Sequence, residues 1–489
     1  MAKWKKTLFI VGSLLILAAL ALMIPGPSPE VPQLADSAPF VWDRTGYWSE
    51  LQRQFEDART KNCPALSKDI EDRLLRVDRL LQEVENNRVP PEAQLLGWLE
   101  MEFFELAPLV AACPQKANRF VRLQTGIRTA LKRRSQDWDM SLRTSRETLY
   151  RVLYGSRAAV EEVLLQSQPD QVKALQEASD EPSATPSAKI LGMTVHSGDI
   201  LLSRGTAPTS ALIARGADFP GNFSHAALVH IDPESSLASI VEAHIEEGAV
   251  VSSLRDYLTD RKARVMLMRL RADLPATRED PLLPHKAATF ALERAVSAHI
   301  PYDFEMDRAD PNKLYCSELA FDAYQRLGVK LWAAESTISS PGLASWLAAF
   351  GVRNMTTLGP SDLEYDPQLS VVAEWRDLDA LWQDHLDNAV VDALLEAAEG
   401  GLELDYSLWE LPLARVAKAV SALLNKMGKV GPIPEGMSAT AALRNRWFSA
   451  RQVDLMQRVA KKADAFSTKE HYRAPYWLLV DFARTAIKE

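Results

Sequence analysis

The chain has 489 residues, room for two or three domains, and its 47% hydrophobic and 25% charged residues are ordinary for a globular protein. The formal net charge of −9 argues against a nucleic-acid partner, because phosphate binding requires clustered lysine and arginine. The single basic run, at residues 132–134, is interpreted as a solvated helix face.

The N-terminus has the pattern of a signal anchor. Lysines precede an uncharged run from Thr7 to Ile24, after which Pro25 ends any helix. Crossing the hydrocarbon core takes about 17–25 helical residues, and lysines on one side keep that end in the cytoplasm. We therefore interpret residues 1–24 as a retained transmembrane helix, with 7–24 in a bacterial inner membrane and the bulk of the chain periplasmic. A cleaved signal peptide is the alternative, since Ala19 and Ala21 could form a cleavage site.

Residues 25–176 are predicted to form a helical domain. Apolar side chains recur there at steps of three and four residues, as on one face of a helix. The first clear set is Ile70, Leu74, Val77, Leu81 and Val84. A proline-rich turn at 87–91 separates this helix from one that begins near residue 92, so the two are expected to be antiparallel.

The chain contains three cysteines. Cys63 and Cys113 each precede a proline at the end of a helical pattern, and antiparallel helices would bring them together. In an oxidising compartment we predict that they form a disulfide. Cys316 is then unpaired, and it is either a small buried apolar residue or a functional thiol.

After a small, polar, proline-containing linker at 177–189, short β-branched runs predict a compact α+β domain over 190–345. Helices are expected there at about 281–299 and 315–327. Residues 346–489 return to helical periodicity, and their tryptophans are interpreted as packing residues. Helical flanks around an α+β domain are therefore expected, and the flanks are candidates for binding a protein partner.

Cys316 is the first candidate for chemistry. It lies in or just before the first turn of the predicted helix at 315–327, where free N–H groups and the helix dipole stabilise a thiolate. The same N–H groups can help to form an oxyanion hole.

His225 is the best candidate among the eight histidines for the base that a thiolate nucleophile requires. It opens an apolar strand, and the small residues before it, Gly221 and Ser224, leave room beside the ring. Glu242, on a neighbouring predicted strand, could orient the imidazole, with His244 on the same strand face as second choice. A structural histidine and an exposed edge-strand glutamate are the alternatives.

Together these motifs resemble a known family. The matching segments are His196–Leu202, Phe223–Val229, Val241–Ala243, and Ile300–Phe304 with Leu314–Leu319. Their order resembles that of circularly permuted papain-like cysteine hydrolases, the YiiX-like branch of the NlpC-type peptidases and amidases, which is related to lecithin retinol acyltransferase. The resemblance covers about 190–345, and neither helical flank is included.

The resemblance implies a permuted papain-like fold with a Cys316–His225–Glu242 site that cleaves or transfers an acyl group. Four further residues are expected to bind substrate: Tyr302, Asp303, Ser224 and Tyr315. We expect hydrolysis of an amide or ester bond in cell-envelope peptides or acyl groups. The alternatives are a lipid acyltransferase or acyl hydrolase, and a non-catalytic membrane-tethered scaffold. No cofactor or metal is expected, because the cysteine and histidine spacings contain no zinc motif.

Overall fold

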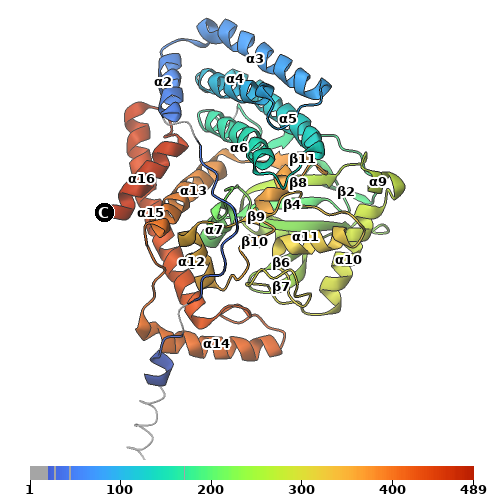
Figure 1. Ribbon diagram of the computed structural model, residues 1–489, viewed down its shortest axis with the longest axis vertical. Coiled ribbons are helices and arrows are strands. Elements are labelled where there is room, and N and C mark those ends of the chain that lie inside the picture. Colours follow the sequence, from blue (N-terminus) through green and yellow to red (C-terminus); the bar gives the residue numbers. More distant parts are fainter. Residues whose placement is uncertain (1–19, 27–28, 43–45, 170) are drawn as a thin grey trace, which may run out of the picture.

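The computed structural model describes residues 20–26, 29–42, 46–169 and 171–489. A helical bundle caps one end of the molecule, an antiparallel sheet lies in the middle, and a second group of helices covers the side and the opposite end (Figure 1). This arrangement confirms an α+β protein with helices on both sides of the sheet-containing region in sequence.

The N-terminal bundle is built as its apolar periodicity predicts. Its helices are α2 (Tyr47–Arg59), α3 (Cys63–Asn86), α4 (Gln94–Ala111), α5 (Ala117–Arg134) and α6 (Arg143–Leu165). All five apolar residues named for the first predicted helix are buried in the core of this bundle. Each step of three or four residues returns the chain to the same helix face, so the apolar residues of α3 all face the other helices of the bundle.

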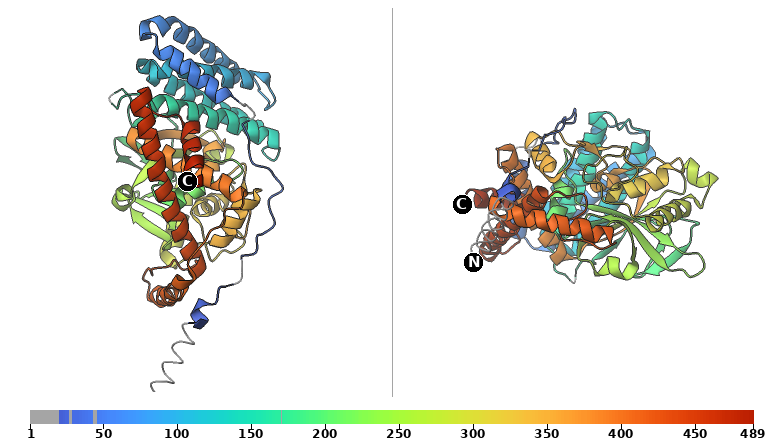
Figure 2. Two further views of the ribbon diagram at one scale, coloured as in Figure 1. Left: turned by 90° about the vertical axis from the view of Figure 1, so that its left-hand side faces the viewer. Right: turned by 90° about the horizontal axis from the view of Figure 1, so that it is seen from below.

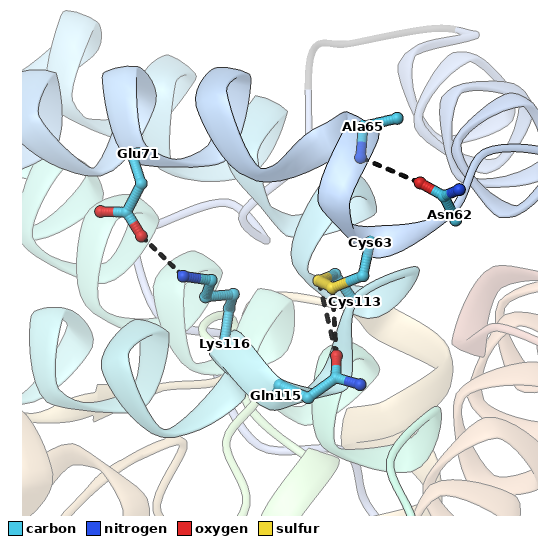
Figure 3. Close-up of a disulfide and its surroundings, with 7 residues drawn as sticks. All are labelled: Asn62, Cys63, Ala65, Glu71, Cys113, Gln115 and Lys116. Atoms are coloured by element: carbon cyan, nitrogen blue, oxygen red, sulfur yellow. Dashed lines mark hydrogen bonds and ion pairs between the residues drawn. A yellow bond between two sulfur atoms is a disulfide. The ribbon is translucent and has the colours of Figure 1, made fainter.

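A disulfide joins the start of α3 to the second residue after α4 (Figure 3). The Cα atoms of Cys63 and Cys113 are 5.3 Å apart, within the range that a disulfide spans. Beside it, the side chain of Asn62 caps α3 by accepting a hydrogen bond of 3.0 Å from the backbone N–H of Ala65. The antiparallel pairing of α3 and α4 thus brings the two cysteines together.

Seven antiparallel strands form the central sheet, in the order β1-β11-β8-β4-β5-β6-β7. They are β1 (Leu175–Glu177), β11 (Leu369–Trp375), β8 (Lys262–Leu270), β4 (Ile200–Gly205), β5 (His225–Ile231), β6 (Ala238–His244) and β7 (Gly248–Ser253). Two smaller pairs stand apart: β2 (Ser187–Ile190) with β3 (Met193–His196), and β9 (Ser336–Thr337) with β10 (Thr356–Thr357). The strands of the 190–345 region lie close to the predicted runs.

The two faces of the sheet are both covered. On one face, α10 (Leu283–Ser297) and α11 (Cys316–Gln325) pack against alternate apolar residues of β4, β5 and β6. Shorter helices lie around the sheet: α7 (Pro208–Arg215), α8 (Leu254–Thr259), α9 (Pro275–Glu279) and α12 (Pro341–Phe350). Burial of both faces explains why the strands read as nearly continuous apolar runs in sequence.

The C-terminal region consists of α13 (Leu378–Glu399), α14 (Leu411–Lys426), α15 (Ala439–Glu470) and α16 (Tyr476–Lys488). The first, third and fourth of these pack together in one core with α12 and α7. α14 projects from this group at the end of the molecule opposite the N-terminal bundle (Figure 1).

Two boundaries expected from the sequence are wrong. The region after residue 345 is not all helical, because β11 lies inside the sheet between β1 and β8. The stretch 177–189 is also not a free linker: Ala178 and Ser179 donate backbone hydrogen bonds of 2.8 and 3.1 Å to Val372 and Val371. Small polar residues pair at a sheet edge through their backbone, which composition alone does not reveal.

In the part of the chain that the structure describes, no helix is long and apolar enough to cross a membrane. Of the transmembrane helix predicted at residues 1–24, residues 1–19 lie outside the part that the structure describes. Residues 29–42 follow the outside of the molecule toward α2 (Figure 2), held at Ala35 and Phe40 by backbone hydrogen bonds of 3.1 and 2.7 Å.

Candidate active site

Cys316 is the first residue of α11, as its sequence context predicts. The residues before it are held by a parallel bridge between Tyr302 and Leu314, in which Asp303 and Leu314 donate backbone hydrogen bonds of 3.1 Å. The thiol is buried, with Sγ 4.0 Å from the carbonyl oxygen of Ser224 and 3.8 Å from the hydroxyl of Ser317. The positive end of α11 therefore acts on a thiol that bulk water barely reaches.

His225 lies at the start of β5, at the end of the sheet that the N-terminus of α11 reaches. Its Nε2 is 2.9 Å from Oε2 of Glu242. This contact leaves Nδ1 as the ring nitrogen available to Cys316, whose thiol is close enough to raise the pKa of His225. His225 keeps 21% of its side-chain surface exposed, so the imidazole is accessible from solvent.

Glu242 holds two histidines. Strand alternation places it on the same face of β6 as His244, and the β5–β6 register, continued from the pair Leu228–Val241, sets His244 opposite His225. The Oε1 atom of Glu242 is 3.1 Å from Nε2 of His244, while Oε2 contacts His225. The rings of His225 and His244 meet edge to face at 5.6 Å. His244 thus supports the glutamate instead of replacing it.

The electrostatics of this group favour an ion pair. Burial opposes the charge on His225, but hydrogen bonds to Cys316 and Glu242 outweigh it and raise the pKa of His225 to about 9. Burial likewise opposes the Cys316 thiolate, yet His225 and the backbone N–H of Ala226 together lower the pKa of Cys316 below its ordinary value. Despite its burial, contact with His225 and His244 holds the pKa of Glu242 well below its usual range.

Two of the four residues expected to bind substrate lie beside the thiol. The carbonyl of Ser224 faces Sγ, and the hydroxyl of Ser224 accepts a hydrogen bond of 3.4 Å from the N–H of Gly205. Tyr302 is buried, and burial together with the nearby Cys316 raises the pKa of Tyr302 far above its usual value.

The other two residues expected to bind substrate, Asp303 and Tyr315, use their polar groups in hydrogen bonds that support the loops. The carboxylate of Asp303 accepts hydrogen bonds from the N–H groups of Glu305 (3.0 Å) and Asp307 (2.5 Å), so it shapes the turn after Tyr302. The hydroxyl of Tyr315 accepts a bond of 3.1 Å from Thr357. We therefore interpret both side chains as structural. A buried carboxylate or phenol hydrogen-bonds to the groups that the fold brings near it, and the sequence does not show which groups those are.

Sequence reasoning missed one buried acid next to Cys316. Glu318, two residues after Cys316, accepts a hydrogen bond of 3.4 Å from the N–H of Tyr315. Burial, reinforced by the charge of Asp322, raises the pKa of Glu318 to about 8. The sequence does contain a signal for this acid. Glu318 lies three residues after Tyr315, which precedes the helix, and an acid at that position is the capping-box pattern.

Two further features bear on the chemistry. His225, Glu242 and His244 offer ligand atoms within 4.8 Å of one another, a set that could hold a metal ion, although ion pairs already join these atoms. A cavity of about 570 Å³ lies between α2, α4, α6, α13 and α16, lined by aromatic, aliphatic and charged side chains. Neither Cys316 nor His225 lines this cavity.

One family of known proteins matches the chain. Residues 194–373 match the model of a family described as permuted papain-like amidase enzymes, YaeF/YiiX, C92 family. The matched segment contains the three candidate residues and runs through most of β11, beyond the boundary at 345 that the sequence suggested. Comparison with curated proteins and with solved structures finds no match.

Proposed function

We propose, on the premise that residues 194–373 belong to the permuted papain-like amidases, that Cys316, His225 and Glu242 form the active site of this cysteine hydrolase. Cys316 is the nucleophile, His225 the general acid and base, and Glu242 orients the imidazole. The contact of 2.9 Å between His225 and Glu242, beside the thiol at the start of α11, is the observation that supports this most directly.

The reaction follows from these positions. His225 takes the thiol proton, and the thiolate adds to an amide or ester carbonyl to form a tetrahedral oxyanion, which N–H groups at the start of α11 stabilise. The imidazolium then protonates the leaving amine or alcohol, and a thioester to Cys316 remains. His225 next draws a proton from water, whose oxygen attacks the thioester. The carboxylic acid leaves and the thiol is restored.

We place this activity on the periplasmic side of a bacterial inner membrane, with residues 7–24 as the anchor and cell-envelope peptides or acyl groups as substrates. The Cys63–Cys113 disulfide supports an oxidising compartment, because structural disulfides are rare in the cytosol. The uncharged run from Thr7 to Ile24 supports the anchor.

Acyl transfer to a lipid acceptor is the second candidate. The observation that favours it is a row of exposed apolar side chains on α14, which includes Leu413 and Leu423. Analysis of the products in the presence of a non-water acceptor separates transfer from hydrolysis.

The site is tested by the rate at which iodoacetamide alkylates Cys316, measured against pH in the full chain and in His225→Ala. The two disulfide-bonded cysteines do not compete for the reagent. Rapid labelling well below pH 8, shifted to higher pH without His225, is expected for an ion-paired thiolate. Slow labelling with the same pH profile in both proteins would remove Cys316 from the proposed role.

A further inference from the structure

An unusual concentration of exposed apolar side chains marks α14 and the turns on either side of it. Trp409, just before the helix, is 81% exposed, and Leu413 is 73% exposed. The full set is Leu408, Trp409, Leu413, Val416, Val420, Leu423, Met427 and Val430. Isolated exposed apolar residues are normal, but a contiguous patch marks a binding surface.

These residues form one stripe along the helix. From Trp409 through Leu413, Val416, Val420 and Leu423 to Met427, the spacing alternates between four and three residues. That spacing keeps side chains on one helix face. The residues that bury α14 against the protein, Leu411, Ala414 and Ser421, occupy other positions of the turn. α14 is therefore apolar on the side that faces away from its own fold.

The charge of this segment is opposite to that of the whole chain. Between Leu411 and Pro434 the sequence has four basic residues and no acidic one, in a protein of net charge −9. The basic residues are Arg415, Lys418, Lys426 and Lys429. An apolar stripe combined with lysine and arginine is the composition of helices that lie in the interface of anionic membranes.

The location of α14 supplies the second argument. Its Arg415 donates hydrogen bonds of 2.9 and 2.7 Å to the carbonyl oxygens of Leu22 and Ile24. Those residues are the last of the uncharged N-terminal run, and Ile24 is itself exposed. Figures 1 and 2 show α14 at the end of the molecule beside the short helix at residues 20–23. A membrane that holds the N-terminal run would thus reach the apolar stripe.

We propose that α14 lies in the interface of the lipid bilayer, with the stripe from Trp409 to Met427 inserted among the lipids. The occupant of this surface is the membrane itself, a second contact beyond the proposed anchor at 7–24. A second copy of this acidic chain or another protein would be a different occupant, and the experiment below separates these cases.

This contact would connect the membrane to the segment that leads toward the candidate active site. The loop after α14 packs on the segment that leads from Tyr302, because Ile433 and Met437 share a cluster with Phe304. On the same loop, Glu435 lies 2.8 Å from Nε2 of His299. Interfacial binding would thereby hold a loop that packs beside the candidate active site at the membrane surface, and a membrane substrate for that site rests on the proposed function.

The test uses the full chain with Cys316→Ser, reconstituted into vesicles of phosphatidylethanolamine and phosphatidylglycerol. A single free cysteine, introduced by Val420→Cys, carries an environment-sensitive fluorophore, while Cys63 and Cys113 stay in their disulfide. Two matched controls carry the same label: Ala422→Cys, exposed elsewhere on α14, and Leu75→Cys, an exposed leucine of α3 at the opposite end of the molecule. Because none of these side chains is buried, the substitutions should leave the fold intact.

The expected result is a blue-shifted emission at position 420 that is quenched when some lipids carry a nitroxide high on the acyl chain, since interfacial helices are buried by about 5–10 Å. Both controls should keep a water-like emission without quenching. A water-like emission at 420 would overturn the proposal. A blue shift without quenching would also overturn it, because it would mean that protein covers the stripe.

A charge variant gives an independent measurement. Val420→Glu with Leu423→Glu should abolish quenching of a label placed at Met427→Cys, because a charged side chain resists entry into the bilayer. In a chain that keeps Cys316, alkylation of that thiol should stay unchanged by the same two substitutions. Unchanged quenching would contradict the proposal, whatever the activity of the enzyme proves to be.

Discussion

At the scale of single residues, the site depends on one buried carboxylate that contacts two imidazoles. Glu242 is 2% exposed, and its two oxygens lie 2.9 and 3.1 Å from His225 and His244. A buried charge is costly unless it is paired, so the glutamate and the protonated His225 stabilise each other. Loss of the carboxylate charge should therefore change the pKa of His225 more than it changes the stability of the fold.

Glu242→Gln tests this. The amide keeps the size of the side chain but removes the negative charge, so the pKa of His225 should fall from about 9 toward its ordinary value. The thiolate of Cys316 then loses its cationic partner, and alkylation of Cys316 near pH 7 should slow by about tenfold for each pKa unit by which its thiol rises. His244→Ala should have a smaller effect, because the contact with His225 remains. A profile in Glu242→Gln equal to that of the unmodified chain would contradict this role.

The pH dependence of activity follows from the same two groups. In the proposed mechanism, turnover needs Cys316 deprotonated and His225 protonated. Activity should fall as pH drops through the lowered pKa of Cys316, because the thiolate is protonated. It should also fall as pH rises through about 9, because His225 loses the proton that the leaving group requires. Hydrolysis of a model amide or ester, followed by kcat/KM against pH, checks both limbs; a flat profile up to pH 10 would refute the assignment of His225 as the acid.

At the scale of elements, a buried cluster of ionic side chains joins the N-terminal bundle to the sheet. Arg157 of α6 is fully buried and pairs with Glu364 and with Glu374 of β11. Arg264 of β8 pairs in turn with Glu161 of α6, at 2.6 Å. These contacts span three segments far apart in sequence, so the bundle and the sheet are coupled through charge as well as apolar packing.

Arg157→Met should be strongly destabilising. The substitution leaves buried carboxylates without their partner, which typically costs about 3–5 kcal/mol of unfolding free energy. Denaturant unfolding monitored by tryptophan fluorescence measures the change. Arg53→Ala is the matched control: Arg53 pairs with Glu50 at 2.7 Å on the exposed face of α2, and its loss should hardly shift the midpoint. Equal midpoints for the two variants would show that the cluster is not structural.

At the scale of the whole molecule, the sheet-containing domain is not a continuous insert between two helical flanks. β11 enters from the C-terminal region and pairs with β8 on one side and β1 on the other. It contributes buried apolar residues to both faces, such as Val371 and Val372. The domain therefore needs a strand that lies beyond the boundary suggested by the sequence pattern.

A chain that ends at residue 345 should consequently fail to fold cooperatively. Removal of β11 leaves β8 with an unpaired edge and separates β1 from the sheet, and unpaired apolar edges favour aggregation. Near-UV circular dichroism and solubility measure the outcome. A chain that starts at residue 25 is the control and should keep its tertiary signal. A well-folded product ending at 345 would show that β11 is dispensable.

The residues of the candidate site could be picked out from the sequence where their signal is local. A cysteine at the start of a helical pattern, a histidine that opens an apolar strand and an acid inside the next strand are all visible within about ten residues of each motif. The roles of Asp303 and Tyr315 were not visible, because each is defined by a partner: backbone N–H groups of a turn for Asp303 and Thr357 for Tyr315.

By itself the sequence indicated the helical flanks and the strands of the 190–345 region, and it singled out Cys316, His225 and Glu242 as candidates, because periodicity and motif order are local properties. Only the tertiary structure decided that β11 completes the sheet and that His244 supports Glu242. The same holds for α14. Its apolar spacing is visible in the sequence. Whether such a stripe faces the core or the solvent depends on which other helices pack against it. Here α13, α15 and α16 form their core without α14, so the stripe is left exposed.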